Sequence, residues 1–269
     1  GAVGGGYSNL AGNNAGSFSD RAFATVGGGE NNEASGDRST VGGGSKNAAS
    51  GGWSSVGGGA RNEASGGRSI IGGGSRNAAS GSYSTVGGGQ SNSAIGNEST
   101  VSGGAGNEAR GFRTSVSGGS ENTASGIGST VGGGEINEAS GDRSTVGGGL
   151  DNTASGRQST IGGGGGNTAS GSGSIVGGGE GNTASGVRSI VGSGAENTAS
   201  GNLSSVSGGV RNCSGGDYSW AGGFRAKVRP ETNSGAVAGE GCDGVPVSGD
   251  FNGDEGTFIW ADSEIADFV

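Results

Sequence analysis

Few side chains in this sequence have the types and the spacing that chemistry requires. The clearest group lies in residues 250–256, where carboxylate and amide oxygens recur at alternate positions, a pattern that suits Ca²⁺. A calcium loop of the EF-hand type has glycine at its sixth position and glutamate at its twelfth, but Glu255 and Ala261 stand there. The alternative is an acidic, glycine-rich turn. The candidate Ca²⁺ ligands are Asp250, Asn252 and Asp254.

The residues that catalysis needs are largely missing from the sequence. The chain has no histidine, so no serine can pair with a histidine base. Paired carboxylates occur only in the acidic C-terminal region, where nothing else indicates an enzyme cleft. The recurring string V-G-G-G-x-x-N lacks the lysine and the serine or threonine of a phosphate-binding loop. We therefore expect a non-catalytic protein with no cofactor apart from the candidate Ca²⁺.

The two cysteines, Cys213 and Cys242, are the other reactive side chains. In an exported protein a single pair of cysteines suggests one disulfide. Within one chain it would close a loop of about 30 residues and stabilise the fold by roughly 3–4 kcal/mol in the chain-entropy model. The alternatives are a bridge between chains and two free thiols.

Composition excludes several classes of protein. Glycine makes up 72 of the 269 residues and only 28% are hydrophobic, so a globular core of large apolar side chains is excluded. The glycine period differs from that of collagen, and no apolar run approaches the ~18 residues of a membrane helix. The net charge is −9, of which residues 213–269 contribute −7, so the chain lacks the basic stripe that nucleic-acid binding needs.

The order of the residues shows a repeat of fifteen residues, with anchors that run from Val26 to Ala221. Asparagine follows each repeated valine or isoleucine six residues later, and glycine follows three and ten residues later. Alanine follows eight residues later from Ala34 to Ala199, and Ser214 ends that series. The glycine content disfavours helix, whereas short alternating triplets between glycine and asparagine are typical of strands. The sequence therefore predicts an all-β solenoid of about thirteen coils, each with two short strands and two turns.

Each repeated position predicts a column of stacked side chains. Valine and alanine would form two apolar columns, and the glycines suggest positive φ or close approach of backbones at corners. The asparagines have two interpretations that stay open here: a left-handed turn, or carboxamides that hydrogen-bond along the stack. Representative members of these structural columns are Val41, Val56, Val131, Val146, Asn47, Asn62, Asn77 and Asn137.

One valine and one alanine per coil is a small apolar content against about 1–2 kcal/mol of backbone entropy per residue. We therefore expect the apolar face to need partner chains, which would make the protein an obligate oligomer. With strands ~4.8 Å apart, the predicted coils would span roughly 60 Å.

The variable residues form two pairs per coil, one after Gly-Gly-Gly and one before Ser-Thr, and this pattern indicates exposed turns. The second pair gathers aromatic and arginine side chains on one edge. This edge is a candidate binding face; the alternative is packing between coils, solvation or contact with a neighbouring chain. Its candidate contact residues are Trp53, Tyr83, Phe112, Arg113, Arg143 and Arg188.

The repeat resembles the head repeats of trimeric autotransporter adhesins of the YadA-like type, and the resemblance is specific because the copies keep one register. It implies a left-handed parallel β-roll, a homotrimer of three chains side by side, and adhesion or display at a surface without catalysis. The segments Asp217–Gly223, Arg225–Lys227 and Gly256–Ser263 resemble a cap that follows such repeats in bacterial surface and fibre proteins.

These observations divide the chain into an atypical N-terminal coil or cap (1–25), the repeat (26–220) and an irregular acidic cap with a loop insert (221–269). We expect a structural or adhesive fibre at the cell surface or outside the cell. Its partners would be its own copies and a surface of protein or glycan, with no nucleic acid and no insertion of this segment into a membrane. The alternatives are a glycan-binding segment of a phage tail fibre, on a virion, and an ice-binding solenoid with an interrupted column of threonines.

Overall fold

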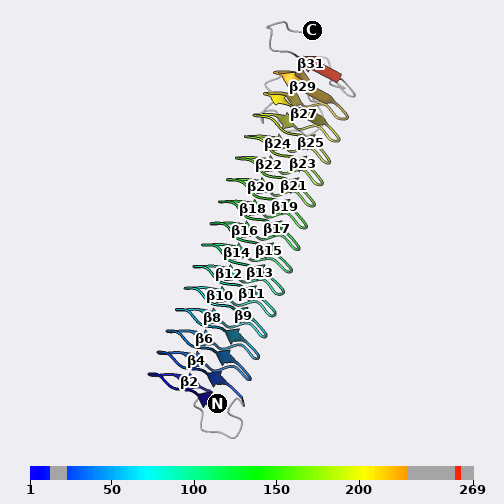
Figure 1. Ribbon diagram of the computed structural model, residues 1–269. Coiled ribbons are helices and arrows are strands. Elements are labelled where there is room, and N and C mark those ends of the chain that lie inside the picture. The colour runs from blue at the N-terminus through cyan, green and yellow to red at the C-terminus, as the bar shows by residue number, and fades with distance from the viewer. Residues whose placement is uncertain (13–22, 229–257, 262–269) are drawn as a thin grey trace. The chain divides into compact units, whose positions relative to one another are not determined.

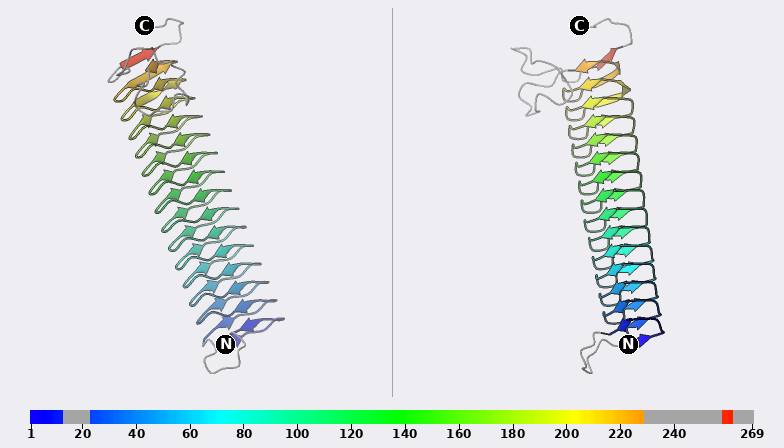
Figure 2. Two further views of the ribbon diagram at one scale, coloured as in Figure 1. Left: turned by 180° about the vertical axis from the view of Figure 1, so that it is seen from behind. Right: turned by 90° about the vertical axis from the view of Figure 1, so that its left-hand side faces the viewer.

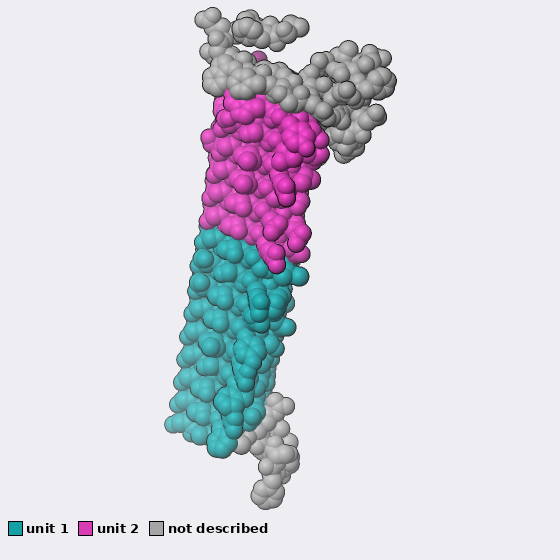
Figure 3. All heavy atoms as spheres, turned by 90° about the vertical axis from the view of Figure 1, so that its right-hand side faces the viewer, with its two compact units in different colours: residues 1–135 teal, residues 136–269 magenta. Residues whose placement is uncertain are grey.

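A computed structural model describes residues 1–12, 23–228 and 258–261 of the chain (Figure 1). These residues form strands and turns only. Within them, no helix is long and apolar enough to span a membrane. The chain divides into two compact units, residues 1–135 and 136–269, which Figure 3 colours separately. Each unit is an all-β parallel solenoid, as the fifteen-residue repeat predicts.

Each coil contributes two short strands, which we call the anchor strand, ending in valine or isoleucine, and the alanine strand. Each strand pairs in parallel with its counterpart in the next coil (Figure 2). The interval is fifteen residues through most of the repeat, for example between Thr25 and Thr40. At the N-terminal end it is 23 residues, since Ala2 pairs with Thr25. In unit 1 the anchor strands are β1 (Ala2–Val3), β3 (Thr25–Val26), β5 (Thr40–Val41), β7 (Ser55–Val56), β9 (Ile70–Ile71), β11 (Thr85–Val86), β13 (Thr100–Val101), β15 (Ser115–Val116) and β17 (Thr130–Val131). The alanine strands are β2 (Leu10–Ala11), β4 (Glu33–Ala34), β6 (Ala48–Ala49), β8 (Glu63–Ala64), β10 (Ala78–Ala79), β12 (Ser93–Ala94), β14 (Glu108–Ala109) and β16 (Thr123–Ala124).

The second unit repeats this arrangement, and its last anchor-type strands are longer. The anchor-type strands of unit 2 are β19 (Thr145–Val146), β21 (Thr160–Ile161), β23 (Ile175–Val176), β25 (Ile190–Val191), β27 (Ser205–Val210), β29 (Trp220–Phe224) and β31 (Phe258–Ala261). The alanine-type strands are β18 (Glu138–Ala139), β20 (Thr153–Ala154), β22 (Thr168–Ala169), β24 (Thr183–Ala184), β26 (Thr198–Ala199), β28 (Cys213–Ser214) and β30 (Lys227–Val228).

From Val26 onward, the apolar core of each coil closes within one chain, whereas Val3 in the first coil is 47% exposed. Side chains alternate across a strand, so the first residue of the anchor strand faces outward and the following valine or isoleucine faces inward. Val41, Val56, Val131 and Val146 are all 0% exposed, and so is the alanine column. The expectation that the valine column needs partner chains is therefore wrong, because its burial is complete without them. Trimerisation itself stays a prediction.

A third buried column consists of the serine or threonine two residues before each anchor from Val41 onward. Ser39 donates a hydrogen bond to the Gly36 carbonyl (2.8 Å), and Thr114 donates one to the Gly111 carbonyl (2.9 Å). A buried hydroxyl without a partner lowers stability, so this column is not what holds the coils together. Among the described residues, the buried hydroxyls without a hydrogen-bond partner belong to Ser54, Ser69, Ser84, Ser99, Ser129, Ser144, Ser159, Ser174, Ser189 and Ser204.

The repeated glycines act in both of the ways that the sequence suggests. Gly59 has φ +86°, and a Cβ there would overlap the Gly74 carbonyl oxygen. Gly66 is different: its φ is not left-handed, but a Cβ there would overlap the Gly81 carbonyl oxygen. Close approach of neighbouring backbones therefore requires glycine at both corners, and left-handed φ requires it at only one of them.

The repeat shortens by one residue near its C-terminal end. Trp220 in β29 pairs with Ser205, fifteen residues earlier, whereas Phe224 pairs with Val210, only fourteen residues earlier. The paired strands continue past this point, since Trp220 also pairs with Phe258 in β31. The parallel sheet thus extends into the region that the sequence assigns to the cap.

Candidate interaction surface

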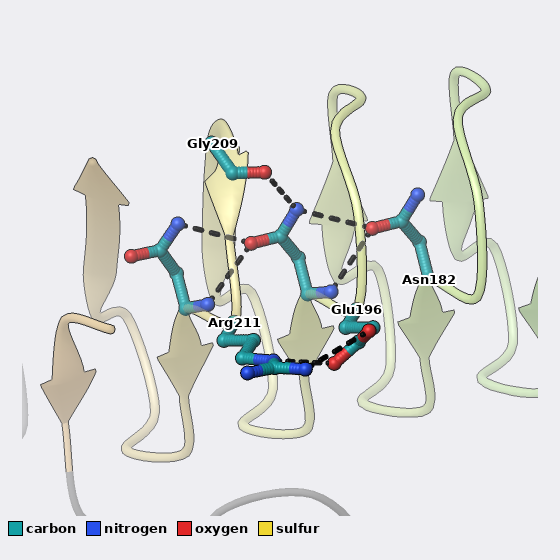
Figure 4. Close-up of polar contacts among 6 residues, drawn as sticks. Asn182, Glu196, Gly209 and Arg211 are labelled. Atoms are coloured by element: carbon teal, nitrogen blue, oxygen red, sulfur yellow. Dashed lines mark hydrogen bonds and ion pairs between the residues drawn. The ribbon is translucent and has the colours of Figure 1, made fainter. Parts of the chain in front are cut away.

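The asparagine column fixes the first turn of each coil, which lies between the anchor strand and the alanine strand. Asn197 Nδ2 donates to the carbonyl of Ser193 in its own turn (3.1 Å) and to that of Gly209 in the next coil (2.9 Å; Figure 4). The Asn197 backbone N–H donates to Asn182 Oδ1 (3.0 Å), and Asn212 continues the series. Among the described residues with positive φ, none belongs to this column. The structure therefore shows the carboxamide ladder, and the left-handed interpretation of these asparagines is wrong.

Asn47, Asn62, Asn77 and Asn137 all lie in this ladder and are 1% exposed. The bonds join each coil to both neighbours, because the carboxamide donates forward and accepts from the next asparagine. The ladder and the glycine corners thus hold the turn backbones in a repeating conformation, so that the turn side chains occupy fixed positions on the surface.

The left-handed residues lie at the second position of each variable turn pair. In the first turn they include Lys46 (φ 59°) and Arg61 (φ 57°), and in the second turn Trp53 (φ 63°) and Arg143 (φ 56°). Residues other than glycine destabilise the backbone by about 1–2 kcal/mol in this conformation. Since Gly128 takes the same conformation in the second turn (φ 65°), the fold accepts glycine there.

We expect Arg143→Gly to raise the free energy of unfolding by about 0.5–1 kcal/mol, because glycine removes the left-handed penalty but gains entropy when unfolded. Urea denaturation followed by circular dichroism measures this change. Arg157→Gly is the matched control, since Arg157 precedes the left-handed residue of the next coil, and it should give no gain. A loss of stability in Arg143→Gly would contradict the conformational argument.

Much of the predicted contact edge packs against itself. The guanidinium of Arg38 lies 4.3 Å from the ring centroid of Trp53 in the next coil and 5.7 Å from that of Phe23. Arg68 repeats this arrangement over Tyr83 (5.1 Å) and also donates a hydrogen bond to its hydroxyl. Trp53 and Tyr83 remain 51% and 54% exposed. Because guanidinium groups cover ring faces on which a sugar would stack, packing between coils accounts for this part of the edge.

The other members of the edge do not form one continuous cluster with these. The Arg113 guanidinium lies 4.6 Å from the Phe112 ring centroid, and its Nε is 2.7 Å from Glu98 Oε2. Arg143 and Arg188 occupy the equivalent turn position in unit 2. In the part of the chain that the structure describes, neither of them stacks on an aromatic ring.

Opposite charges in neighbouring coils can pair directly across the turns. Arg211 Nε lies 2.6 Å from Glu196 Oε2 (Figure 4). The hydrogen bond from Arg211 and then its charge lower the pKa of the Glu196 carboxyl, and the same contacts raise the pKa of Arg211. The ion pair therefore stabilises the fold at pH values above the usual pKa of a glutamate, and this stabilisation is lost as pH falls through the lowered pKa. Because the pair is exposed, it adds little stability.

A shallow hollow of about 820 Å³ lies over the first turns of unit 2. Leu150 and Ala195 line it, and Gly165, Gly166 and Gly181 leave its floor without side chains. The hollow is therefore a stretch of exposed backbone between larger turn residues.

The remaining candidate residues are placed only in part. Cys213 lies in β28 and is 1% exposed, but Cys242 lies outside the described residues, so the disulfide stays a prediction. The candidate Ca²⁺ ligands Asp250, Asn252 and Asp254 also lie outside them. In the described ranges, no group of three or more histidine, cysteine, aspartate or glutamate residues could hold a metal ion.

No protein-family model matches this chain, and no curated protein matches it. The resemblance to adhesin head repeats thus rests on the repeated residues, and the parallel solenoid is compatible with it.

Proposed function

We propose that this chain is a non-catalytic segment of an extracellular structural or adhesive fibre, a homotrimer of left-handed rolls that presents its turns to a host or environmental surface. One observation carries the proposal: the side chains that repeat are buried, while the pairs that vary lie on exposed turns of fixed conformation. A scaffold of this kind suits display and multivalent contact.

The outward residues of the anchor strands support self-association. From residue 25 to residue 220 they are threonine, serine, isoleucine or tryptophan, and none is charged. Ile70, Ile175 and Ile190 are 41–49% exposed at these positions. A repeated uncharged stripe of this kind, rich in β-branched threonine and isoleucine, is suited to contact with the equivalent surface of other copies.

Light scattering on the full chain tests this proposal. We expect a mass three times the 25.1 kDa of one chain. The double variant I175K/I190K places two charges on the stripe and should yield monomers. The matched double variant I127K/I136K changes two exposed turn isoleucines and should remain trimeric. Beads coated with the trimer should attach to glycan or protein surfaces more strongly than beads coated with the monomeric variant. A wild-type monomer would overturn the assembly, and equal attachment would overturn multivalent adhesion.

The exposed turns bear on the glycan-binding alternative, and the outward residues of the anchor strands bear on the ice-binding alternative. The glycan-binding tail-fibre alternative is supported by the exposed edges of Trp53 and Tyr83, although arginines cover ring faces there. Ice binding is less favoured, because Ile70 and Ile175 interrupt the outward threonines of the anchor strands. We also propose the bridge between Cys213 and Cys242, which the burial of Cys213 supports.

A further inference from the structure

Three cations follow one another on the first-turn edge of unit 1. Lys46, Arg61 and Arg76 occupy the same turn position in three successive coils, and all three are exposed. Their backbones are in register, because the residues just before them pair as parallel bridges. Paired strands lie ~4.8 Å apart, so these positions form a row with that spacing. We call these three residues the cationic strip.

No anion among the described residues neutralises the cationic strip. The ion pairs in the described ranges join other side chains. Glu63 follows Arg61 by two residues but lies on the alanine strand, and Glu30 precedes the strip by one coil at the other position of its turn pair. The next carboxylate at the strip's own position is Glu121, three coils beyond Arg76.

Elsewhere the chain places opposite charges in this same geometry. Glu196 and Arg211 hold the strip's turn position in successive coils and lie 2.6 Å apart, so neighbouring coils can form ion pairs there. Like charges on neighbouring strands destabilise a sheet. The cationic strip therefore carries repulsion that opposite charges would have removed, in a protein with 15 basic and 24 acidic residues.

The backbone adds a second unfavourable term at the same residues. Lys46, Arg61 and Arg76 have φ of 59°, 57° and 57°, a conformation that favours glycine. Gly106 and Gly166 show that glycine occupies this turn position in other coils. Other coils hold residues such as Ser91 and Glu121 in the same conformation, so the turn itself sets it, and glycine can replace the three cations without a change of fold.

We propose that the cationic strip binds an extended anionic polysaccharide, with successive sulfate or carboxylate groups on successive coils. Arginine binds such groups through two parallel hydrogen bonds and lysine as a point charge. The hydroxyls of Ser45 and Ser75, beside the strip, can bond sugar hydroxyls. The first turns from Ser45 to Ser91 contain no aromatic side chain on which a base would stack, which disfavours single-stranded nucleic acid.

This inference rests on the proposed function in one respect, namely that a homotrimer would carry three strips and gain avidity. Light scattering on the same sample that is used for the binding measurement separates the proposed homotrimer from the proposed binding by the cationic strip. A trimer that binds no anionic polysaccharide overturns the strip and leaves the fibre intact, and a monomer that binds overturns the assembly and leaves the strip intact.

The experiment measures binding of the full chain to immobilised dextran sulfate and polygalacturonate, with neutral dextran and a single-stranded DNA oligonucleotide beside them. The test variant is K46G/R61G/R76G, which should fold at least as well as wild type because glycine suits these φ values. The charge-matched control is R110G/R157G/R211G, which removes three cations that lie outside the strip and, among the described residues, stack on no aromatic ring.

We expect wild type to bind at least one of the two anionic polysaccharides and not neutral dextran. The strip variant should lose at least about tenfold in affinity and about three units of the log–log salt slope, one for each cation removed, while the control stays within about twofold of wild type. Binding to dextran sulfate alone would assign the strip to sulfates, and binding to polygalacturonate alone to carboxylates. Equal loss in both variants, no binding to either anionic polysaccharide, or tighter binding to DNA would overturn the proposal.

Discussion

Replacing Asn62 with alanine is expected to lower the free energy of unfolding by about 3–5 kcal/mol. Its Nδ2 donates to the carbonyls of Gly58 and Gly74, both at 2.9 Å. Its Oδ1 accepts from the backbone N–H and the Nδ2 of Asn77, at 3.0 and 3.1 Å. Alanine removes all four hydrogen bonds and leaves the N–H of Asn77 buried, and each unsatisfied buried group costs about 1–3 kcal/mol.

Urea denaturation followed by circular dichroism measures the loss. Amide hydrogen exchange should show faster opening of the coils on both sides of residue 62, because stability in a solenoid is a sum of contacts between neighbours. Ser69→Ala is the matched control, since this serine is equally buried but its hydroxyl has no hydrogen-bond partner. It should leave stability unchanged or raise it, because the substitution removes a buried hydroxyl that has no partner. Equal effects of the two substitutions would contradict the role of the ladder.

The second large effect is expected from Gly59→Ala, which should destabilise the protein by about 3–5 kcal/mol. Gly59 has φ +86°, and a Cβ there would overlap the carbonyl oxygen of Gly74 in the next coil. The same Cβ would lie 2.8 Å from Asn62 Nδ2, so it would also displace the ladder. Neighbouring backbones would have to separate to admit one methyl group.

The adjacent residue provides the control for this substitution. A Cβ on Gly58 would meet only the Gly43 carbonyl oxygen, at 3.9 Å, and its φ is not left-handed. We expect Gly58→Ala to be neutral or slightly stabilising, since alanine has less conformational freedom when unfolded. Thermal melts of the two variants, side by side with wild type, measure the difference. Similar melting temperatures for both variants would refute the close approach of the coils.

The period and the roles of most columns could be predicted from the sequence. A fixed interval of fifteen residues indicates stacked coils, and the alternation of a polar residue with valine indicates one outward and one inward side chain. For the asparagine column, the sequence allowed two interpretations, a left-handed turn and a carboxamide ladder, and could not decide between them. Its hydrogen bonds depend on carbonyls that only the stacked turns bring within reach, such as those of Gly58 and Gly74 around Asn62.

Closure of the core could not be predicted from apolar content. Counting one valine and one alanine per coil omits the buried asparagines, the buried serine column and the close backbone contacts at glycine, which also fill the interior. Since each coil is thin, these small residues complete the burial of Val56 without any partner. The inference that burial of the apolar face needs partner chains failed for this reason.

The conformation of the turns was also missed, and so was the cationic strip. Arginine, tryptophan and lysine disfavour positive φ, so nothing in their side chains indicates the left-handed conformation of Trp53 or Lys46. The strip had a signal in the sequence: bases recur at fifteen-residue spacing in Lys46, Arg61 and Arg76. The shortened coil had one as well, since Gly-Gly-Phe-Arg ending at Arg225 repeats Gly-Gly-Val-Arg ending at Arg211, fourteen residues earlier.

The central claim is that coils closed by a carboxamide ladder within each chain hold variable turns in fixed positions. Hydrogen exchange of asparagine side-chain amides, followed by NMR, tests it most directly. The carboxamides of interior ladder members such as Asn62 and Asn167 should exchange far more slowly than that of exposed Asn31, because both of their neighbouring coils must separate first. Exchange of Asn62 and Asn167 at the rate of Asn31 would contradict the ladder and the fixed turns that depend on it.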